Sequence, residues 1–237
     1  MPLEAEFIMR LDKYISSVTD MSRMQVKRAL KSAEVTVNGV AVTDQRTMVQ
    51  ADDEVMFNGE LLRAAKLRYF MLHKPEGYVC ATKDKTNMTI LELLDEDNLE
   101  ALHAAGRLDI DTTGLVLVTD DGQWSHRITA PKSDCKKTYY VETSEPIEQE
   151  VIATFREGIK LKGELRPTLP AELVLVHEQA ARLTLCEGKY HQVKRMFAAV
   201  GNKVELLHRE RIGNIVLDED LEPGEYRELT EQEVASL

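Results

Sequence analysis

The feature that most limits the fold of this chain is a short apolar run, residues 115–118 (LVLV), that follows a polar loop. A run of this length and composition is typical of a buried strand. The loop before the run holds two acids, Asp109 and Asp111, together with two threonines and two glycines. Loops that present acids at the end of a buried strand are frequent positions for sites. The stretch therefore predicts either a functional loop or a solvated acidic turn.

The overall composition indicates a cytoplasmic protein. Its 237 residues are enough for one large domain or two smaller ones, and 43% of them are hydrophobic. No apolar run approaches the ~20 residues that a membrane helix needs, and the first residues do not resemble a signal peptide. Three widely spaced cysteines, Cys80, Cys135 and Cys186, predict free thiols in a reducing compartment. We expect no membrane association and no metal site.

Charge is distributed unevenly along the chain, whose net charge is −11. Residues 10–31 hold six basic and two acidic side chains, and residues 182–211 hold seven basic and three acidic ones. Residues 212–237, by contrast, hold eight acids and one arginine. Salt screening confines electrostatic fields to ~8–10 Å, so two basic stretches can bind phosphate despite the negative total. Net charge does not exclude a nucleic-acid partner.

The N-terminal quarter of the chain predicts two short helices followed by hairpins. Residues 9–18 have a helical apolar pattern, and a capping box at Ser22–Gln25 opens a second helix that extends to residue 32. On this second helix we expect Met24, Val26 and Leu30 to face inward. Four basic residues can share its outer face: Arg23, Lys27, Arg28 and Lys31. The Asn-Gly pair at 38–39, between two valine-rich runs, predicts a tight hairpin.

These features together resemble the S4 RNA-binding domain over residues 9–62, through LDKYISS, SRMQVKRALKSAEVTVNG and VQADDEVMFNG. We therefore divide the chain into a flexible extension (1–8), an S4 domain (9–65) and a second domain (66–237). The resemblance implies that a basic face of the S4 domain contacts structured RNA. The residues assigned to that contact are Arg10, Lys13, Arg23, Lys27, Arg28 and Lys31.

The second domain has alternating strand and helix signals. We predict strands at 69–72, 78–80, 115–118, 137–141, 173–176, 181–186 and 204–207. We predict helices at 89–94, 124–128, 146–155 and 191–200, and an acidic terminal helix after a capping box at 230–233. The helix at 191–200 ends at Gly201 and presents His191, Lys194 and Arg195 on one face.

Three readings of the acidic loop follow from its residues. The order D-x-D-x-T resembles the start of phosphatases that use an aspartate nucleophile, but there the strand precedes the first acid, whereas here it follows. A structural reading has Asp111 cap the loop, together with Thr112 and Thr113, through side-chain to backbone hydrogen bonds. A third reading makes Asp109 a nucleophile or acid/base group in a nucleic-acid cleft, kept ionised by a cation from the 191–200 helix.

A second resemblance orders these readings. The string HAAGRLDIDTTGL resembles the RLD motif of the pseudouridine synthases, and further blocks match the same family: YFMLHKPEGYVC, DDGQWSHRIT, KTY and EGKYHQVKRM. The resemblance implies an α+β protein whose catalytic domain has a mixed, mainly antiparallel sheet and a central cleft. It also implies a reaction without cofactors, in which uridine in RNA is isomerised to pseudouridine.

The same resemblance assigns roles to individual residues. It implies that Asp109 is the essential aspartate, that Tyr139 stacks on the flipped-out target base, and that Lys194 pairs with Asp109. It places Arg107 and Arg195 against the RNA. Many relatives have arginine where Lys194 stands, so the charge is retained but the bidentate geometry is not.

The branch that the chain resembles acts on small-subunit (16S) rRNA, which implies free rRNA or the assembling small subunit as the partner of a monomeric enzyme. Two alternatives stay open on the sequence. One is a pseudouridine synthase that acts on large-subunit rRNA. The other is a non-catalytic S4-type protein that binds rRNA during ribosome assembly.

Overall fold

The computed structural model describes residues 8–19, 21–50, 52–62, 67–130 and 133–237. The chain forms two compact units, residues 1–66 and 67–237. Residues 1–7 of the predicted extension, and residues 63–66 around the predicted domain boundary at residue 65, lie outside the described residues. Residue 8, which we assigned to the extension, is the first residue of a strand.

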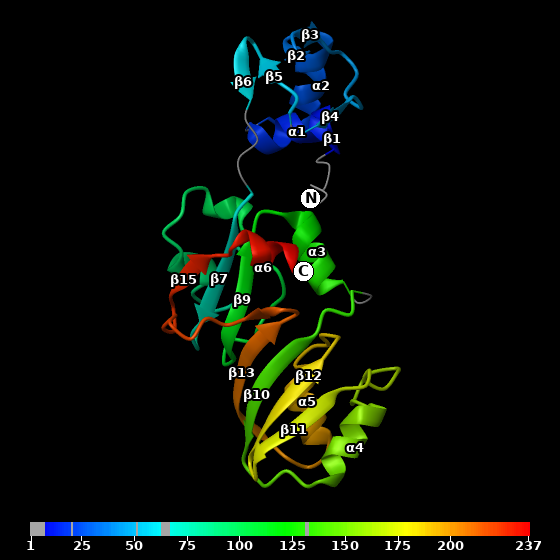
Figure 1. The fold of residues 1–237 in the computed structure, drawn as a ribbon, viewed down its shortest axis with the longest axis vertical. Coiled ribbons are helices and arrows are strands. Elements are labelled where there is room, and N and C mark those ends of the chain that lie inside the picture. The colour runs from blue at the N-terminus through cyan, green and yellow to red at the C-terminus, as the bar shows by residue number, and fades with distance from the viewer. Residues whose placement is uncertain (1–7, 20, 51, 63–66, 131–132) are drawn as a thin grey trace. The chain divides into compact units, whose positions relative to one another are not determined.

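The described residues of the first unit form two helices and six short strands, which Figure 1 labels. Its elements are β1 (Ile8–Arg10), α1 (Leu11–Val18), α2 (Arg23–Lys31), β2 (Val35–Val37), β3 (Val40–Ala41), β4 (Met48–Gln50), β5 (Val55–Phe57) and β6 (Glu60–Leu62). Four strands form an antiparallel sheet in the order β3-β2-β5-β6, and β1 pairs with β4. Side chains from both helices and both sheets form one core, which includes Leu11, Ile15, Val26, Leu30, Val35, Val49 and Val55.

Local sequence signals explain most of this unit. Ser22 caps α2 through the predicted capping box with Gln25. Asn38 and Gly39 both have positive φ, as a two-residue hairpin with a type I′ turn requires.

Two predictions for the first unit are wrong. The first helix begins at residue 11 instead of 9, because residues 8–10 pair with β4. Met24 is 67% exposed, since it lies about 200° around the helix from the buried Val26.

The second unit is built on one nine-stranded sheet. Its strands are β7 (Tyr69–Lys74), β8 (His103–Ala104), β9 (Thr113–Thr119), β10 (Lys137–Thr143), β11 (Glu172–His177), β12 (Ala180–Leu185), β13 (Val204–Ile212), β14 (Ile215–Val216) and β15 (Tyr226–Glu228). Its helices are α3 (Gly122–Thr129), α4 (Glu150–Glu157), α5 (Gln192–Ala199) and α6 (Glu231–Ala235), with 3₁₀ turns at Ile90–Leu93 and Leu99–Ala101. The main strand order is β11-β12-β10-β13-β9-β7-β15, with β14 beside β13 and β8 beside β9.

Strand pairing confirms the predicted mixed, mainly antiparallel sheet. Among the pairs that the described residues form in it, β9 and β13 alone are parallel, with His208 opposite Thr113 and Arg209 opposite Gly114. Strand β9 is buried on both faces, as its apolar run predicts. Val116 and Val118 pack into one cluster, while Leu115 and Leu117 pack into another on the opposite face.

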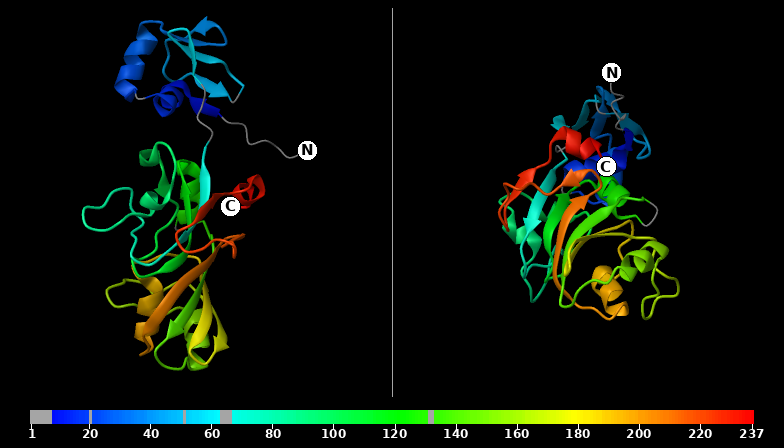
Figure 2. Two further views of the ribbon diagram at one scale, coloured as in Figure 1. Left: turned by 90° about the vertical axis from the view of Figure 1, so that its left-hand side faces the viewer. Right: turned by 60° about the horizontal axis from the view of Figure 1, so that its bottom comes forward.

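The helices cover the sheet according to their apolar faces. Figures 1 and 2 show α4 and α5 on the same side of the β10–β13 half, where Phe155 and Phe197 pack edge to face. Helix α5 ends where predicted, with Gly201 at φ +81°. On the other half, the fully buried Trp124 of α3 donates its indole N–H to the carbonyl of Val234 in α6 (3.0 Å).

Three predictions for the second unit are wrong in detail. Residues 78–80 form a single bridge, Val79 to Thr89, instead of a strand. Residues 90–93 form a 3₁₀ turn instead of an α-helix. Helix α4 begins at residue 150 instead of 146, because the Ile147 amide bonds to the carbonyl of Glu178 beside the β11–β12 turn.

Candidate active site

The acidic loop lies immediately before β9, and hydrogen bonds from Lys74 hold its backbone. This lysine is fully buried at the end of β7. Its ammonium group donates to the carbonyls of Thr112 (2.7 Å) and Pro75 (3.0 Å), with a longer contact to that of Ile110 (3.4 Å). Burial lowers the pKa of Lys74. A backbone hydrogen bond adds to this support, from the Thr112 amide to the backbone carbonyl of Asp109 (3.1 Å).

A second buried cation, Arg209 of β13, holds the loop from the other side. Its side chain is 2% exposed. Its Nε donates to the carbonyl of Leu115 (2.8 Å), and an Nη reaches that of Arg107 (3.5 Å). These two carbonyls bracket the loop that carries Asp109. A Cβ at residue 114 would overlap the Arg209 backbone, so the glycine there permits this close approach.

Sequence reasoning did not single out Arg209, which we counted only as part of a basic stretch. One signal could have identified it. Arg209 follows Leu207 at the two-residue spacing of one strand face, and both side chains are buried. An arginine at a core-facing position of a strand indicates a buried charge that has partners inside the protein.

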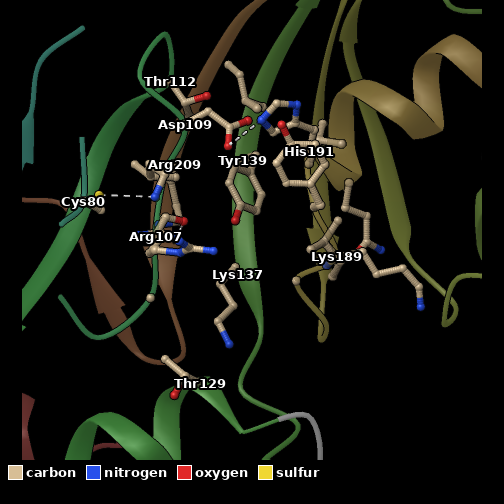
Figure 3. Close-up of a pocket in the computed structure, with 18 of the residues that line it drawn as sticks. Cys80, Arg107, Asp109, Thr112, Thr129, Lys137, Tyr139, Lys189, His191 and Arg209 are labelled. Atoms are coloured by element: carbon tan, nitrogen blue, oxygen red, sulfur yellow. Dashed lines mark hydrogen bonds and ion pairs between the residues drawn. The ribbon is translucent and has the colours of Figure 1, made fainter. Parts of the chain in front are cut away.

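Asp109 has two basic neighbours, both from the segment that begins α5. Lys194 Nζ lies 3.5 Å from Asp109 Oδ2, as the sequence predicted. His191 Nε2 lies 3.4 Å from Asp109 Oδ1 (Figure 3), a contact that we did not predict. His191 immediately precedes the helix and has a left-handed backbone (φ +47°). The Asp109 side chain is 29% exposed, so the pair is partly shielded from water.

Asp111 also contacts Lys194, and more closely. Its Oδ1 accepts a hydrogen bond from Lys194 Nζ at 2.5 Å. Partial burial raises the pKa of Asp111, but the hydrogen bond and charge of Lys194 outweigh that effect and hold the pKa below its ordinary value. One lysine therefore serves two carboxylates, the nearer of which is 56% exposed.

The loop-capping role that the sequence suggested is wrong for the two threonines. The Thr112 hydroxyl is buried and has no hydrogen-bond partner among the described residues. The Thr113 hydroxyl bonds to Nδ1 of His208 (2.8 Å) on β13 instead of to its own loop. The loop is held by two long cationic side chains that lie far from it in sequence, which is why local reasoning did not identify them.

Tyr139 enters the site from the centre of the sheet. It lies on β10 and is half-buried, and it packs against both the β10–β13 core and the β7–β9 core. The guanidinium carbon of Arg209 is 6.0 Å from the centre of its ring. Figure 3 shows Tyr139 between Asp109, Arg107 and Arg209 on one side and His191 and Lys189 on the other.

These side chains line one cavity of about 760 Å³, within the usual size of a small-molecule pocket. Three of the five site residues predicted for the second domain line it: Arg107, Asp109 and Tyr139. Lys194 contacts Asp109 but is not one of the residues that line the cavity. Further lining comes from Lys137 at the start of β10 and from the segment after β12, including Cys186, Lys189 and Tyr190.

Arg195, which we predicted to contact RNA, makes hydrogen bonds within the protein. One Nη donates to the Glu164 carboxylate (3.0 Å) and to the Tyr190 carbonyl (2.9 Å), and the other donates to the Lys162 carbonyl (2.7 Å). These bonds join the loop at 162–164 to the start of α5. The RNA contact of Arg195 stays a prediction that this arrangement does not support.

In the first unit, the cations predicted to bind RNA are mostly exposed. The four on α2 and Lys13 on α1 are all exposed, and within the described residues none of these five makes a side-chain hydrogen bond or ion pair. Arg10 differs from them. It forms a bidentate pair with Asp12 (3.0 and 2.8 Å), so its guanidinium is already occupied.

The described part of the chain lacks two kinds of feature. Within it, no group of three or more histidine, cysteine, aspartate or glutamate side chains could hold a metal ion. None of its helices is long and apolar enough to cross a membrane.

Comparison with protein families gives two matches. Residues 68–199 match the model of RNA pseudouridylate synthases, and residues 9–55 match that of the S4 domain. The first match contains Asp109, Tyr139, His191 and Lys194, so every residue in the immediate contact network of Asp109 lies inside it.

Individual relatives match over nearly the whole chain. The ribosomal small subunit pseudouridine synthase A of Vibrio cholerae is 53% identical over 229 residues, which are 97% of this chain and 99% of that protein. The protein of the same name from Escherichia coli K12 is 52% identical over 230 residues, 97% of this chain and 100% of its own length. A crystal structure described as a pseudouridylate synthase superposes with a TM-score of 0.71 at 49% identity, and covers 96% of this chain and 99% of that one.

Proposed function

The chain belongs to the RNA pseudouridylate synthase family, and we propose that it isomerises one uridine of small-subunit rRNA to pseudouridine. The observation that carries the proposal is the partly shielded carboxylate of Asp109, which faces His191 and Lys194 at a cavity that also holds Tyr139. The near-complete match to small-subunit enzymes supports the choice of rRNA.

The reaction rearranges atoms within one nucleotide. The C1′–N1 glycosidic bond breaks, the uracil turns, and C5 joins C1′. The proton on C5 is lost and N1 gains one, so the balance requires no redox partner and no ATP. What the reaction does require is a group that assists departure of the base, a surface that holds the free base while it turns, and protection from water.

Asp109 is the group that we assign to the sugar carbon. A carboxylate acts as a nucleophile while it is ionised, and nearby positive charge favours that form. Lys194, at 3.5 Å from Asp109, supplies such a charge, and protonated His191 would supply another. The carboxylate either adds to C1′ or assists a glycal-like intermediate, and both paths need it ionised and close to the sugar.

Tyr139 is the surface that we assign to the base. The nucleotide must leave its stack, at a cost of a few kcal/mol, and an aromatic ring can receive the extruded base. The Tyr139 ring is fixed between two cores, so it loses little freedom when a base stacks on it. Arg107 is exposed at the same cavity, two residues before Asp109, where its guanidinium can meet a phosphate of the flipped nucleotide.

The S4 unit supplies the remaining RNA contacts in this proposal. Five exposed cations, which have no side-chain partner among the described residues, can neutralise phosphates and orient a structured RNA without reading its bases. The partner is small-subunit rRNA, free or in the assembling subunit. The enzyme acts as a monomer in this proposal, and the three free cysteines are in keeping with a cytoplasmic enzyme.

The two alternatives are not favoured. A large-subunit target would require this chain to differ in substrate from relatives that are about 52% identical to it. A non-catalytic assembly protein would not need an aspartate and a tyrosine at one cavity. Pseudouridine formation on purified small- and large-subunit rRNA tests all three. We expect one new pseudouridine in small-subunit rRNA and none in large-subunit rRNA, and mapping in cells that lack the protein should show the same site unmodified.

The Asp109→Asn variant is the negative control in that experiment, because it lacks the assigned catalytic carboxylate. Modification of large-subunit rRNA alone would overturn the substrate assignment. Tight binding with no modification of either RNA would revive the assembly protein.

A further inference from the structure

Tyr190 is the one exposed aromatic side chain in the described part of the chain, and it lies at the mouth of the cavity. It is 73% exposed, whereas the other large exposed apolar side chains are aliphatic. Its residue lines the same cavity as Asp109 and Tyr139. Tyr190 therefore places an exposed aromatic ring beside the site assigned to the target nucleotide, where RNA can reach it.

Tyr190 is held in place more firmly than its exposure suggests. Its ring stacks on that of His191, with ring centres 3.8 Å apart and planes at 21°. Its carbonyl accepts a hydrogen bond from Arg195 (2.9 Å), and Arg195 is in turn fixed by Glu164 and the Lys162 carbonyl. A ring that is already ordered loses little entropy when a second flat group stacks on its free face.

The geometry of base flipping supplies such a flat group. A nucleotide that turns into the cavity leaves its stack, and the neighbouring bases lose a stacking partner. Proteins that bind unstacked RNA bases cover them with aromatic rings, which suits any base because every base has a π face. Tyr139 inside the cavity is assigned to the target base, so the outer ring is free for a neighbour.

We propose that Tyr190 is a stacking platform for a base that flanks the target uridine. The inference rests on the proposed function, because the ligand is the RNA whose nucleotide enters the cavity. The Tyr190 ring stacks on that of His191, and His191 Nε2 lies 3.4 Å from the Asp109 carboxylate. A base stacked on Tyr190 would therefore be linked to that carboxylate through two side chains that contact each other. Binding of the flanking base would thereby limit the movement of His191 at the site.

A double-mutant cycle between protein and RNA tests this proposal. The RNA is a fragment of small-subunit rRNA that the native protein binds, made as a series with one abasic nucleotide at each successive position. The proteins are the native chain, Tyr190→Ala, Tyr190→Phe and Leu165→Ala. Leu165 is the matched control because it is 97% exposed and apolar but does not line the cavity. Affinity is measured by titration at one fixed salt concentration.

We expect Tyr190→Ala to weaken binding of the intact fragment by roughly 5- to 150-fold, the range for one base on an aromatic ring. Tyr190→Phe keeps the ring and should bind within about 2-fold of the native chain, as should Leu165→Ala. At one flanking position, the abasic RNA should bind Tyr190→Ala and the native chain equally, because the stacked pair is already lost. At every other position the two losses should add.

Two results would overturn the proposal. One is Tyr190→Ala binding the intact fragment as tightly as the native chain does. The other is additive losses at all positions, which would show that Tyr190 touches no base. These titrations do not depend on turnover. Native protein that binds the fragment but forms no pseudouridine in any rRNA would instead count against the proposed function.

Discussion

Cationic side chains on α2 and around the Asp109 loop are of the same types but in opposite situations. Arg23, Lys27, Arg28 and Lys31 are exposed, and within the described residues their side chains make no hydrogen bond or ion pair. At the loop, Lys74 and Arg209 are buried and bonded to backbone carbonyls, and Lys194 contacts two carboxylates. The chain thus has one set of cations available to phosphate and another that is already used by the protein.

The difference shows that a basic stretch in a sequence does not by itself identify an RNA-binding surface. Exposed charges act through a screened field, so their effects on RNA affinity are modest, additive and sensitive to salt. Charges held in the interior fix the position of a backbone or a carboxylate, and losing one leaves buried groups without partners. The two sets should therefore respond differently to substitution.

Loss of Lys194 should produce the largest effect of these substitutions. Lys194→Met removes the cation beside Asp109, and we expect the single-turnover rate to fall by roughly 10²- to 10³-fold, as for removal of one preorganised electrostatic partner. Lys194→Arg retains the charge and should keep most of the activity. Lys203→Met is the matched control, since Lys203 pairs with the exposed Glu205 and does not line the cavity. A native rate for Lys194→Met would show that catalysis does not require the charge of Lys194.

Substitution of Arg209 should have the next largest effect. In Arg209→Met both hydrogen bonds that bracket the loop are lost, so Asp109 is displaced and kcat should fall by roughly 10- to 100-fold while KM changes little. Arg209→Lys can keep one bond and should recover part of kcat. Thermal unfolding of each variant separates displacement from loss of fold. If KM rose and kcat did not change, Arg209 would be an RNA contact and would belong with the cations of α2.

Arg227 is bonded within the protein and does not line the cavity. Its loss should therefore lower stability without changing the rate of catalysis. It bonds to Asp218 (2.6 Å) and to Glu233 (2.8 and 2.9 Å) and so fixes α6. The hydrogen bond from Arg227 lowers the pKa of Glu233 from 4.5 to about 2. Arg227→Met should lower the free energy of unfolding by about 2 kcal/mol at pH 7 and leave kcat unchanged.

The pH dependence of that effect has a definite sign. Because the Glu233 pKa is lower in the folded chain, its contribution is complete above pH 4.5 and disappears as the pH falls toward 2. Denaturant titrations of native protein and Arg227→Met should therefore converge over this range. A difference that is constant from pH 7 to pH 2 would show that the Glu233 carboxylate is not the partner that matters.

The smallest effects should come from the exposed cations of α2. Lys27→Gln and Arg28→Gln should each weaken RNA binding only a few-fold and reduce the slope of log affinity against log salt by about 0.7–0.9. Neither should change the single-turnover rate at saturating RNA. Binding and rate measured at four salt concentrations would show this. A fall in rate at saturation would mean that α2 does more than neutralise phosphate.

Much of the fold was predictable because its signals are local. The capping boxes at Ser22 and Thr230, the Asn38-Gly39 hairpin and the Gly201 helix end all depend on residues within a few positions of one another. The buried strand β9 follows from its apolar run. Asp109 and Lys194 were placed together correctly, but through family resemblance instead of through local pattern.

The parts that were missed depend on contacts across long stretches of chain. Arg209 brackets the loop only because β9 and β13 pair in parallel, a pairing between residues nearly a hundred positions apart. Nothing in the local sequence places His191 against Asp109 or commits Arg195 to Glu164. Asp111 also belongs here, because its bond to Lys194 forms only when α5 meets the loop.

We assign catalysis to Asp109, and not to the more exposed Asp111, although Lys194 lies nearer to Asp111. Single-turnover pseudouridine formation on small-subunit rRNA by Asp109→Asn and Asp111→Asn tests it directly, with RNA affinity measured in parallel. We predict that Asp109→Asn lowers the rate by roughly 10³-fold or more while still binding RNA, and that Asp111→Asn stays within about 10-fold of the native rate. The reverse order of the two variants, or a native rate for Asp109→Asn, would contradict the account.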